Sequence, residues 1–167
     1  MKKIKFRGKR KDNEEWVYGY PIVLKSPIGE KNCFILREDF EIDWAGDYPG
    51  TQLLENFIEV IPETVGRYIE IDDLHGKEMF EGDIIKLYQP DGKTFSEVPT
   101  AYIFYEKGAW RVSGFDKFPY ILSSLELKFE VIGNIHDNPE VLIKGKIQLL
   151  QELELEYKKA VNYYLKL

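Results

Sequence analysis

Residues 4–24, IKFRGKRKDNEEWVYGYPIVL, decide the fold of the first part of this chain. Ile4 and Phe6 alternate with basic residues, which is the two-residue period of a strand that buries one face and exposes the other. Turn-forming residues at 11–14 then separate this strand from an aromatic and aliphatic run. The stretch therefore predicts a β-hairpin in which the first strand buries its apolar side chains and exposes its basic ones.

The first 135 residues continue this pattern of short strands. Aromatic and β-branched residues are plentiful, and turn-forming residues interrupt them at about every ten positions. Turns containing glycine at 72–77, 90–92 and 107–108 fit the connections between such strands, because glycine accepts a positive φ. The expected strands are 32–36, 56–61, 67–71, 84–88, 101–105, 109–113 and 129–135.

The C-terminal residues change to a helical period. Asn138-Pro139 suits the start of a helix, because proline at the first helical position loses no hydrogen bond. Apolar residues then recur at three- and four-residue spacing, which is typical of an amphipathic helix of about six turns. The stripe consists of Leu150, Leu153, Tyr157, Val161 and Tyr164. Two interpretations stay open: the stripe packs against the protein's own β body, or it pairs with a second helix in a homo-oligomer.

The composition is that of a soluble globular protein. Of 167 residues, 44% are hydrophobic and 31% are charged, which suits one domain or two small subdomains and argues against disorder. The only cysteine, Cys33, excludes an intramolecular disulfide and fits a reducing cytoplasm. The N-terminus lacks the apolar stretch of a signal peptide, and no window is apolar enough for a membrane span. We therefore expect a cytoplasmic protein without a membrane partner.

The charge is unevenly distributed along the chain. The net charge is -6, yet residues 1–11 carry seven positive charges and no negative ones. Residues 12–143 carry 11 basic and 26 acidic residues, and residues 144–167 carry five basic and three acidic ones. The acidic body argues against nonspecific binding to nucleic acid, whereas the basic N-terminus favours contact with phosphates.

The basic N-terminal strand is the candidate nucleic-acid site, because clustered positive charge is what phosphate contacts require. Its residues are Lys3, Lys5 and Arg7 on one face of the strand, with Lys9, Arg10 and Lys11 at the turn. The alternative is that a lysine-rich outer face protects an edge strand from unwanted pairing.

Five segments follow one another in a fixed order along the chain. They are IKFRGK at 4–9, WVYG at 16–19, VIPETVGRY at 60–68, HGKEMFEGDII at 75–85 and FEVIGNIHDNPEVL at 129–142. Together they resemble the YopX protein family of bacteriophages and prophages of low-GC Gram-positive bacteria. The resemblance covers everything except the C-terminal helix.

The resemblance implies a mainly β protein with barrel-like, SH3-like subdomains that works in the cytoplasm of a host cell. We expect a YopX-like β domain over 1–142, with two subdomains meeting near 62–75, and a C-terminal amphipathic helix over 143–167. The family has no established activity, so no catalytic residue carries over. Where the family has Thr-Gly-Leu, this chain has residues 69–71, Ile-Glu-Ile, which favours a longer strand there.

The segment Glu81-Gly82-Asp83 has an architectural interpretation. Gly82 accepts the backbone conformation of a tight corner, and Asp83 is placed to bond nearby amides before a buried strand resumes.

Residues with catalytic or metal-binding chemistry are few. Cys33 lies in an apolar run, so we expect a small buried side chain instead of a nucleophile. His75 and His136 lie in polar turns without metal-ligand spacing, and we expect both at the surface. Asp72-Asp73 beside His75 offer a weak cation site, but adjacent carboxylates in a turn usually bond backbone amides. We expect no enzyme activity, no metal and no cofactor.

Residues 37–51 form an acidic and aromatic segment that predicts a loop facing solvent or a partner. Its carboxylates, Glu38, Asp39, Glu41, Asp43 and Asp47, fail the spacing of an EF-hand. Phe40, Trp44 and Tyr48 recur every four residues, which favours packing on the sheet over recognition of a partner.

The resemblance implies a phage or prophage accessory protein, and together with the features above we expect it to bind a macromolecule, to self-associate and to catalyse no reaction. We expect its partner to be a host or phage protein. The alternative is a nucleic-acid-binding regulator that uses the basic N-terminal strand.

Overall fold

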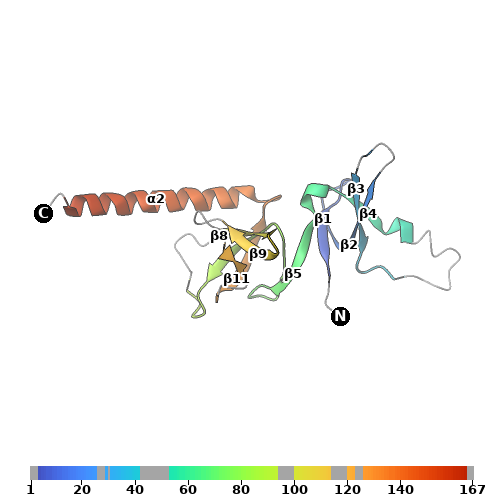
Figure 1. The fold of residues 1–167 in the computed structure, drawn as a ribbon, viewed down its shortest axis with the longest axis horizontal. Coiled ribbons are helices and arrows are strands. Elements are labelled where there is room, and N and C mark those ends of the chain that lie inside the picture. Colours follow the sequence, from blue (N-terminus) through green and yellow to red (C-terminus); the bar gives the residue numbers. More distant parts are fainter. Residues whose placement is uncertain are drawn as a thin grey trace. The chain divides into compact units, whose positions relative to one another are not determined.

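The computed structural model describes residues 4–25, 29, 31–41, 53–93, 100–113, 120–122 and 126–164. The chain folds into two compact units, Met1–Ile71 (unit 1) and Asp72–Leu167 (unit 2). Antiparallel strands form most of both units, and a long helix follows the last strand (Figure 1). The prediction of a mainly β protein with a C-terminal helix is therefore confirmed.

Unit 1 contains a sheet in which β4, β3, β2, β1 and β5 lie in that order. The bounds are β1 Phe6–Lys9, β2 Trp16–Lys25, β3 Lys31–Arg37, β4 Phe57–Val60 and β5 Gly66–Asp72, with a 3-10 helix, η1, at Pro62–Thr64. β1 and β2 form the predicted hairpin, in which Arg7 faces Tyr18 and Lys9 faces Trp16. The longer strand expected at 69–71 is also present, as part of β5.

The core of unit 1 lies on one face of this sheet, where β2, β3 and β4 place their apolar side chains together. Its members are Val17, Cys33, Ile35 and Val60, with Ile58 and Val65 packed against them. Cys33 is buried, as its apolar neighbours predicted.

The prediction that the first strand buries its apolar side chains and exposes its basic ones is wrong. Ile4 is 54% exposed, whereas Lys5 and Arg7 are only 7% and 6% exposed. β1 pairs with β2 on one side and β5 on the other, so it is a central strand and does not need protection as an edge. The physical reason for the reversal is the pairing: Arg7 lies directly opposite Tyr18, so the cations of β1 share a face with the aromatic residues of β2. Lys3 lies outside the described residues.

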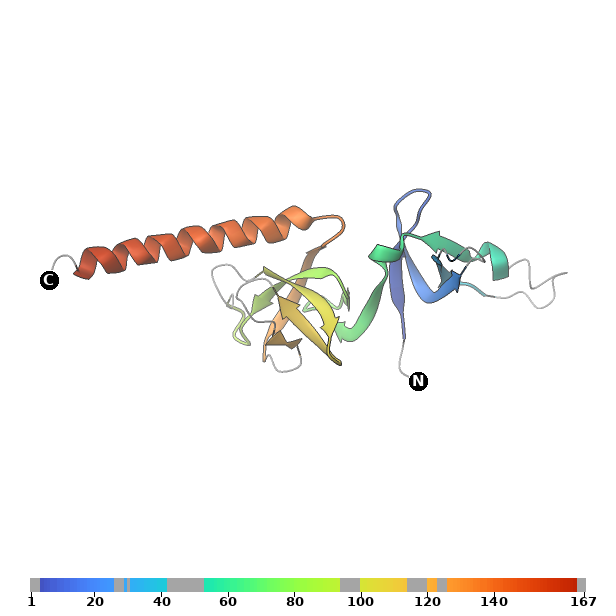
Figure 2. The same ribbon diagram turned by 45° about the horizontal axis from the view of Figure 1, so that its top comes forward.

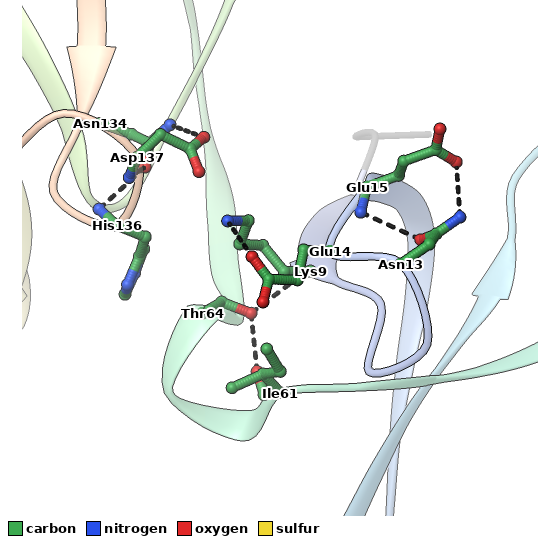
Figure 3. Close-up of polar contacts among 9 residues, drawn as sticks. All are labelled: Lys9, Asn13, Glu14, Glu15, Ile61, Thr64, Asn134, His136 and Asp137. Carbon is green, nitrogen blue, oxygen red and sulfur yellow. Dashed lines mark hydrogen bonds and ion pairs between the residues drawn. The ribbon is translucent and has the colours of Figure 1, made fainter.

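The 3-10 helix η1 attaches to β1 through one buried hydroxyl group, drawn in Figure 3. The backbone N–H of Lys9 donates to Thr64 Oγ1 over 2.8 Å, and this hydroxyl donates to the carbonyl of Ile61 over 2.7 Å. Ile61 N–H donates in turn to the carbonyl of Lys9 over 2.8 Å. Thr64 therefore holds the end of β1 against the segment between β4 and β5.

Unit 2 contains a second antiparallel sheet with the strand order β10-β9-β8-β7-β11. The strands of the unit are β6 Glu78–Phe80, β7 Asp83–Tyr88, β8 Thr100–Glu106, β9 Ala109–Ser113, β10 Tyr120–Ile121 and β11 Lys128–Asn134. Its buried hydrophobic residues come from most of these strands and are Met79, Phe80, Ile84, Ile85, Leu87, Ala101, Ile103, Val112, Leu122 and Phe129.

Sheet closure is not confirmed. β10 and β11 are the two edges of the second sheet, and no sheet closes among the described strands. The barrel-like, SH3-like subdomains that the resemblance implied are therefore not confirmed, although predicted hairpins are present. β8 and β9 pair across Lys107-Gly108, with Glu106 facing Ala109.

The corner between β6 and β7 has the predicted architectural role. Gly82 has a φ of +84°, and Asp83 Oδ2 accepts the backbone N–H of Phe80 over 2.7 Å. Ile135 N–H donates to the carbonyl of Gly82 over 2.9 Å, which ties the corner to the segment after β11.

The C-terminal helix, α2, spans Pro139–Tyr164 and thus begins before the predicted 143 (Figure 2). Gly145 in its first turns is buried, and α2 contacts β8. Beyond this, Leu150, Leu153 and Tyr157 are 65%, 53% and 71% exposed. The interpretation that these three side chains pack against the β body is therefore wrong. Val161 is half-buried, and the Tyr164 side chain lies outside the described part of the chain.

Gly19 in β2 supplies a test of the β2–β3 pairing. A Cβ atom there would lie 1.9 Å from the Leu36 carbonyl oxygen and 2.9 Å from Glu38 N, so the strands would have to separate. We expect Gly19→Ala to lower the free energy of unfolding by about 2–4 kcal/mol, measured by urea denaturation.

Gly92→Ala is the matched control. Gly92 also has a positive φ, +87°, but nothing lies within 4 Å of its Cβ position. It should cost only about 1 kcal/mol, the strain of a left-handed backbone. Equal losses in the two variants would contradict the close approach at Gly19.

Candidate functional site

Unit 1 contains a pocket of about 400 Å³ at one end of its sheet. Three chain segments form it: the end of β1, the start of β2 and the end of β3, and Ile58 of β4 adds an apolar contact. The lining residues are Arg10, Glu15, Trp16, Val17, Tyr18, Arg37, Glu38, Asp39 and Ile58. We call this site the unit 1 pocket.

Two arginines of the unit 1 pocket are fixed by neighbouring carboxylates. Arg10 donates from Nε and Nη2 to the two carboxylate oxygens of Asp12, over 2.9 and 2.6 Å. Arg37 forms the same bidentate pair with Asp39, in which Nε and Nη2 donate over 2.9 and 2.5 Å. These hydrogen bonds raise the pKa of each guanidinium and lower the pKa of each carboxyl group. The paired geometry holds both planar groups in a defined orientation.

Two aromatic rings of the pocket rest on the buried cations of β1. The Lys5 ammonium lies 5.1 Å from the centre of the Tyr18 ring, and the Arg7 guanidinium lies 4.5 Å from the Trp16 ring. Lys5 also forms an ion pair with Glu38 over 2.6 Å. These contacts position the rings and Glu38, because buried cations need both charge partners and polarisable neighbours.

The charge of the unit 1 pocket is mixed. Two lining residues are basic and three, Glu15, Glu38 and Asp39, are acidic. Tryptophan, tyrosine and arginine are the side chains that contribute most binding energy at protein interfaces. The pocket thus combines aromatic rings, an apolar contact and both signs of charge.

The predicted nucleic-acid residues of unit 1 are engaged within the protein. Besides the contacts of Lys5 and Arg7, Lys9 lies 3.8 Å from Glu14 and Lys11 lies 2.5 Å from Glu59. Arg10 binds Asp12, as described above. The structure therefore brings Arg10 into the pocket and pairs the other described cations with aromatic rings or carboxylates, while nucleic-acid binding itself stays a prediction.

The polar turn of unit 2 contains two of the other candidates, Asp73 and His75. Asp73 Oδ1 accepts the backbone N–H groups of His75 and Lys77 over 2.8 and 2.9 Å, and Oδ2 accepts that of Val131 over 3.1 Å. Burial by itself raises the pKa of Asp73, but the three N–H donors outweigh it and the pKa is lowered. The expected backbone-bonding role of this turn is confirmed.

His75 lies at the surface and faces Glu130. Its Nε2 is 3.6 Å from Glu130 Oε1, and the Tyr88 hydroxyl donates to Glu130 Oε2. Glu130 and Tyr88 have no sequence signal for this contact, because they approach His75 only through the pairing of β7 with β11 and the turn before β6.

His136 belongs to a turn organised by Asn134, also drawn in Figure 3. Asn134 Oδ1 accepts the backbone N–H groups of His136 and Asp137, each over 2.9 Å, and its Nδ2 donates to Asp137 over 2.7 Å. His136 is half-buried in this turn, so it is less exposed than His75 at the expected surface position.

Unit 1 also contains the candidate nucleophile Cys33 and the first part of the acidic segment 37–51. Burial raises the pKa of the Cys33 thiol, which favours its protonated, weakly nucleophilic form. Of the acidic segment 37–51, Glu38 and Asp39 line the pocket and Glu41 is exposed. Asp43, Trp44, Asp47 and Tyr48 lie outside the described residues, so their predicted roles are untested.

The fold and the pocket define a small, mainly β protein with a pocket lined by aromatic and charged side chains. The model of the YopX protein family matches residues 5–143, which is most of the chain, so this protein belongs to the YopX family. The family resemblance inferred from the five segments is thereby confirmed.

A solved structure shows the same fold. The crystal structure of protein EF1440 from Enterococcus faecalis is 24% identical, and the match covers 85% of this chain and 99% of that one with a TM-score of 0.52. At this identity the likeness concerns the fold alone. No curated protein matches the chain. Within the residues that the structure describes, no helix has the length and apolar character needed to cross a membrane.

The hydrogen bonds of Asp73 predict a pH-dependent stability. Because the pKa of Asp73 in the folded state lies below its ordinary value of 3.8, the folded protein binds this proton less tightly than the unfolded chain does. The contribution is complete at neutral pH and disappears as the pH falls through 3.8 toward the lowered pKa. Asp73→Asn should lower the free energy of unfolding by about 1–3 kcal/mol at neutral pH.

The measurement is urea denaturation of both proteins at pH 7 and pH 3. The difference between wild type and Asp73→Asn should shrink at the lower pH. Asp91→Asn is the comparison for an exposed turn, because Asp91 accepts one backbone N–H, from Lys93, and pairs with Lys93 Nζ over 3.0 Å. These contacts lower the pKa of Asp91 as well, so its effect should change with pH in the same direction but be smaller than that of Asp73→Asn. A difference that stays constant between the two pH values would contradict the role given to the ionised Asp73.

Proposed function

We propose that this protein is a non-enzymatic accessory protein of a phage or prophage that acts in the host cytoplasm. It binds a host or phage protein through the unit 1 pocket and self-associates through α2. The phage origin is supported by the family resemblance, and the cytoplasmic location by the single, buried, free thiol.

The composition and geometry of the unit 1 pocket carry this proposal. The cations of Arg7 and Lys5 contact the rings of Trp16 and Tyr18 and restrict their orientation before a partner binds. The two rings therefore lose little conformational entropy on binding. Arg10 and Arg37 are held by carboxylates in the same manner. A site that is ordered before its partner arrives binds more tightly than one that must order on contact.

The local charges favour a protein partner over nucleic acid. Phosphate binding depends on cations that release counterions from the nucleic acid, and the described cations of β1 and the following turn already have carboxylate or ring partners. Opening those ion pairs would cost binding energy. A nucleic-acid-binding regulator is therefore the second candidate, and the experiment below separates the two.

The non-enzymatic part of the proposal is supported by how the reactive groups are used. Cys33 is buried among the core side chains of unit 1, and burial raises the pKa of its thiol. Asp73 and Asn134 bind backbone amides. These side chains stabilise turns and the core, which are structural tasks.

The pocket is tested by protein capture from host-cell lysate with wild type, Tyr18→Ala and Tyr105→Ala. Both tyrosines are exposed, but Tyr18 lines the pocket, whereas Tyr105 lies on β8 of unit 2. We expect the same protein with wild type and Tyr105→Ala, retained after nuclease treatment. With the purified partner, Tyr18→Ala should weaken binding by about 2 kcal/mol.

Two outcomes would contradict the binding of a protein partner in the unit 1 pocket. Loss of the captured protein after nuclease treatment, with binding of labelled oligonucleotides that falls steeply with salt, would favour the nucleic-acid alternative. Equal affinity of the partner for Tyr18→Ala and wild type would show that binding occurs elsewhere. Lys5 and Arg7 are unsuitable test positions, because their side chains are buried and their substitution would perturb folding.

Self-association is tested with two leucines of α2 that are equally exposed. Leu153 and Leu155 are both 53% exposed, but two helical positions separate them, which places them on nearly opposite faces. Only Leu153 belongs to the apolar stripe. Leu153→Lys should shift the mass from light scattering toward that of the monomer, whereas Leu155→Lys should keep the wild-type mass.

Both substitutions replace leucine by another good helix former, so helix stability is matched. A monomeric mass for the wild type over the tested concentrations would reject self-association. Equal masses for the two variants would reject the role of the stripe.

A further inference from the structure

β2 extends beyond the strand that pairs with it on one side. β3 pairs with β2 from Gly19 to Lys25, whereas the pairs between β1 and β2 end at Phe6 and Gly19. Among the residues that the structure describes, the part of β2 after Gly19 therefore has a neighbouring strand on one side only. We call residues 21–25, on the side of β2 that faces away from β3, the β2 edge.

The backbone groups of the β2 edge follow from the alternation of hydrogen bonds in an antiparallel pair. Glu38 N–H donates to the Tyr18 carbonyl over 3.0 Å, so Tyr18 and every second residue after it bond toward β3. The residues between them, Pro21, Val23 and Lys25, direct their backbone groups away from β3. Val23 offers an N–H and a carbonyl there, whereas Pro21 offers only a carbonyl and cannot continue the ladder with β1.

The β2 edge is open and apolar at its centre. Val23 is 59% and Leu24 is 55% exposed. No residue in the described part of the chain forms a hydrogen bond with the outward backbone groups of Val23. Backbone donors and acceptors at strand spacing match those of another extended chain, whereas a helix uses its own backbone groups internally. The β2 edge therefore fits an added strand.

The charges at the end of the β2 edge indicate which strand fits. Lys25 lies directly opposite Lys31 of β3, and both side chains are exposed. Like charges in directly opposed positions destabilise a pair of strands. Within the described ranges, neither lysine has an ion-pair partner. An acidic side chain of an added strand, next to Lys25, would relieve this repulsion.

We propose that an extended segment of a partner protein adds to the β2 edge as an antiparallel strand, with an acidic residue opposite Lys25. Pro21 and the two lysines restrict the choice of strand, because the proline removes one donor and the lysines repel a basic segment. A second copy of this edge fits less well, since residues 20–25, YPIVLK, contain no acidic residue.

The proposed contact is separate from the unit 1 pocket. The pocket includes residues 16–18, at the start of β2, whereas the β2 edge lies at its end. Strand addition therefore goes beyond the proposed function and does not depend on it.

The test is a titration of the isotope-labelled full chain with the synthetic peptide acetyl-Glu-Thr-Val-Thr-Thr-amide, followed through the backbone amide signals by NMR. In the antiparallel register, its glutamate lies opposite Lys25 and its valine opposite Val23. We expect the largest shifts at these two amides and slower hydrogen exchange at Val23. The same peptide with lysine in place of glutamate should bind about fivefold more weakly at low salt. Lys25→Glu should reverse this preference.

Val23→Pro and Val23→Thr form a matched pair of variants. The Val23 N–H points away from β3, so proline removes an outward donor without removing a bond between β2 and β3. Threonine keeps the N–H and the β-branched shape. Val23→Pro should weaken binding of the glutamate peptide by about tenfold, whereas Val23→Thr should stay within about twofold of wild type. A peptide with N-methylated valine tests the same hydrogen bonds on the wild-type protein and should bind as weakly.

The remaining outcomes overturn the proposal in distinguishable ways. Absence of peptide-induced shifts, or equal binding of the N-methylated peptide, overturns strand addition. Equal binding of the glutamate and lysine peptides overturns the acidic partner. Shifts confined to residues 16–18 and 37–39 place the peptide in the unit 1 pocket, so the β2 edge fails while the proposed function stands. A wild-type mass above that of the monomer that falls to it in Val23→Pro, without peptide, indicates a second copy at this edge and overturns the partner strand.

Discussion

The burial of two cations in a central strand is the constraint on which unit 1 depends. Arg7 belongs to β1, which pairs on both sides, and Lys5 directly precedes that strand, so both side chains must find partners on the sheet face they occupy. Removing a charge from water is costly unless other groups compensate for the lost hydration. Here the compensation comes from Tyr18, Trp16 and Glu38.

The unit 1 pocket follows from that compensation. The two rings that contact the cations of β1 also form part of the pocket wall, and Glu38, which binds Lys5, lies at the end of β3 beside Arg37. A change in the buried cations would therefore move the wall of the pocket. The stability of unit 1 is therefore coupled to the shape of its pocket. The basic residues Lys5 and Arg7 support the pocket wall without lining the pocket, so the net charge of the lining is not positive.

Unit 2 uses its buried polar groups differently. Asp73, Asp83 and Asn134 accept backbone N–H groups at the ends of strands, where turns leave amides without partners in the sheet. These side chains replace missing sheet hydrogen bonds and so fix where β6, β7 and β11 begin or end. The contact proposed for unit 2 is instead the exposed stripe of α2, so the contacts proposed for the protein lie in both units.

Local periods in the sequence determined the strands, the hairpins and the helix of this protein, because alternation and three-to-four spacing act over a few neighbouring residues. The apolar neighbours of Cys33 and the backbone freedom of Gly82 were enough to predict the roles of these two residues. The very short strands β6 and β10 were not predicted, because two or three residues are too few to show a period. Alternation in β1 defined two faces but not which of them is buried; only pairing with β2 and β5 decided that. Likewise, residues 10, 15–18, 37–39 and 58 form a pocket because strand pairing unites them, and the exposure of the α2 stripe depends on how far the β body reaches along the helix.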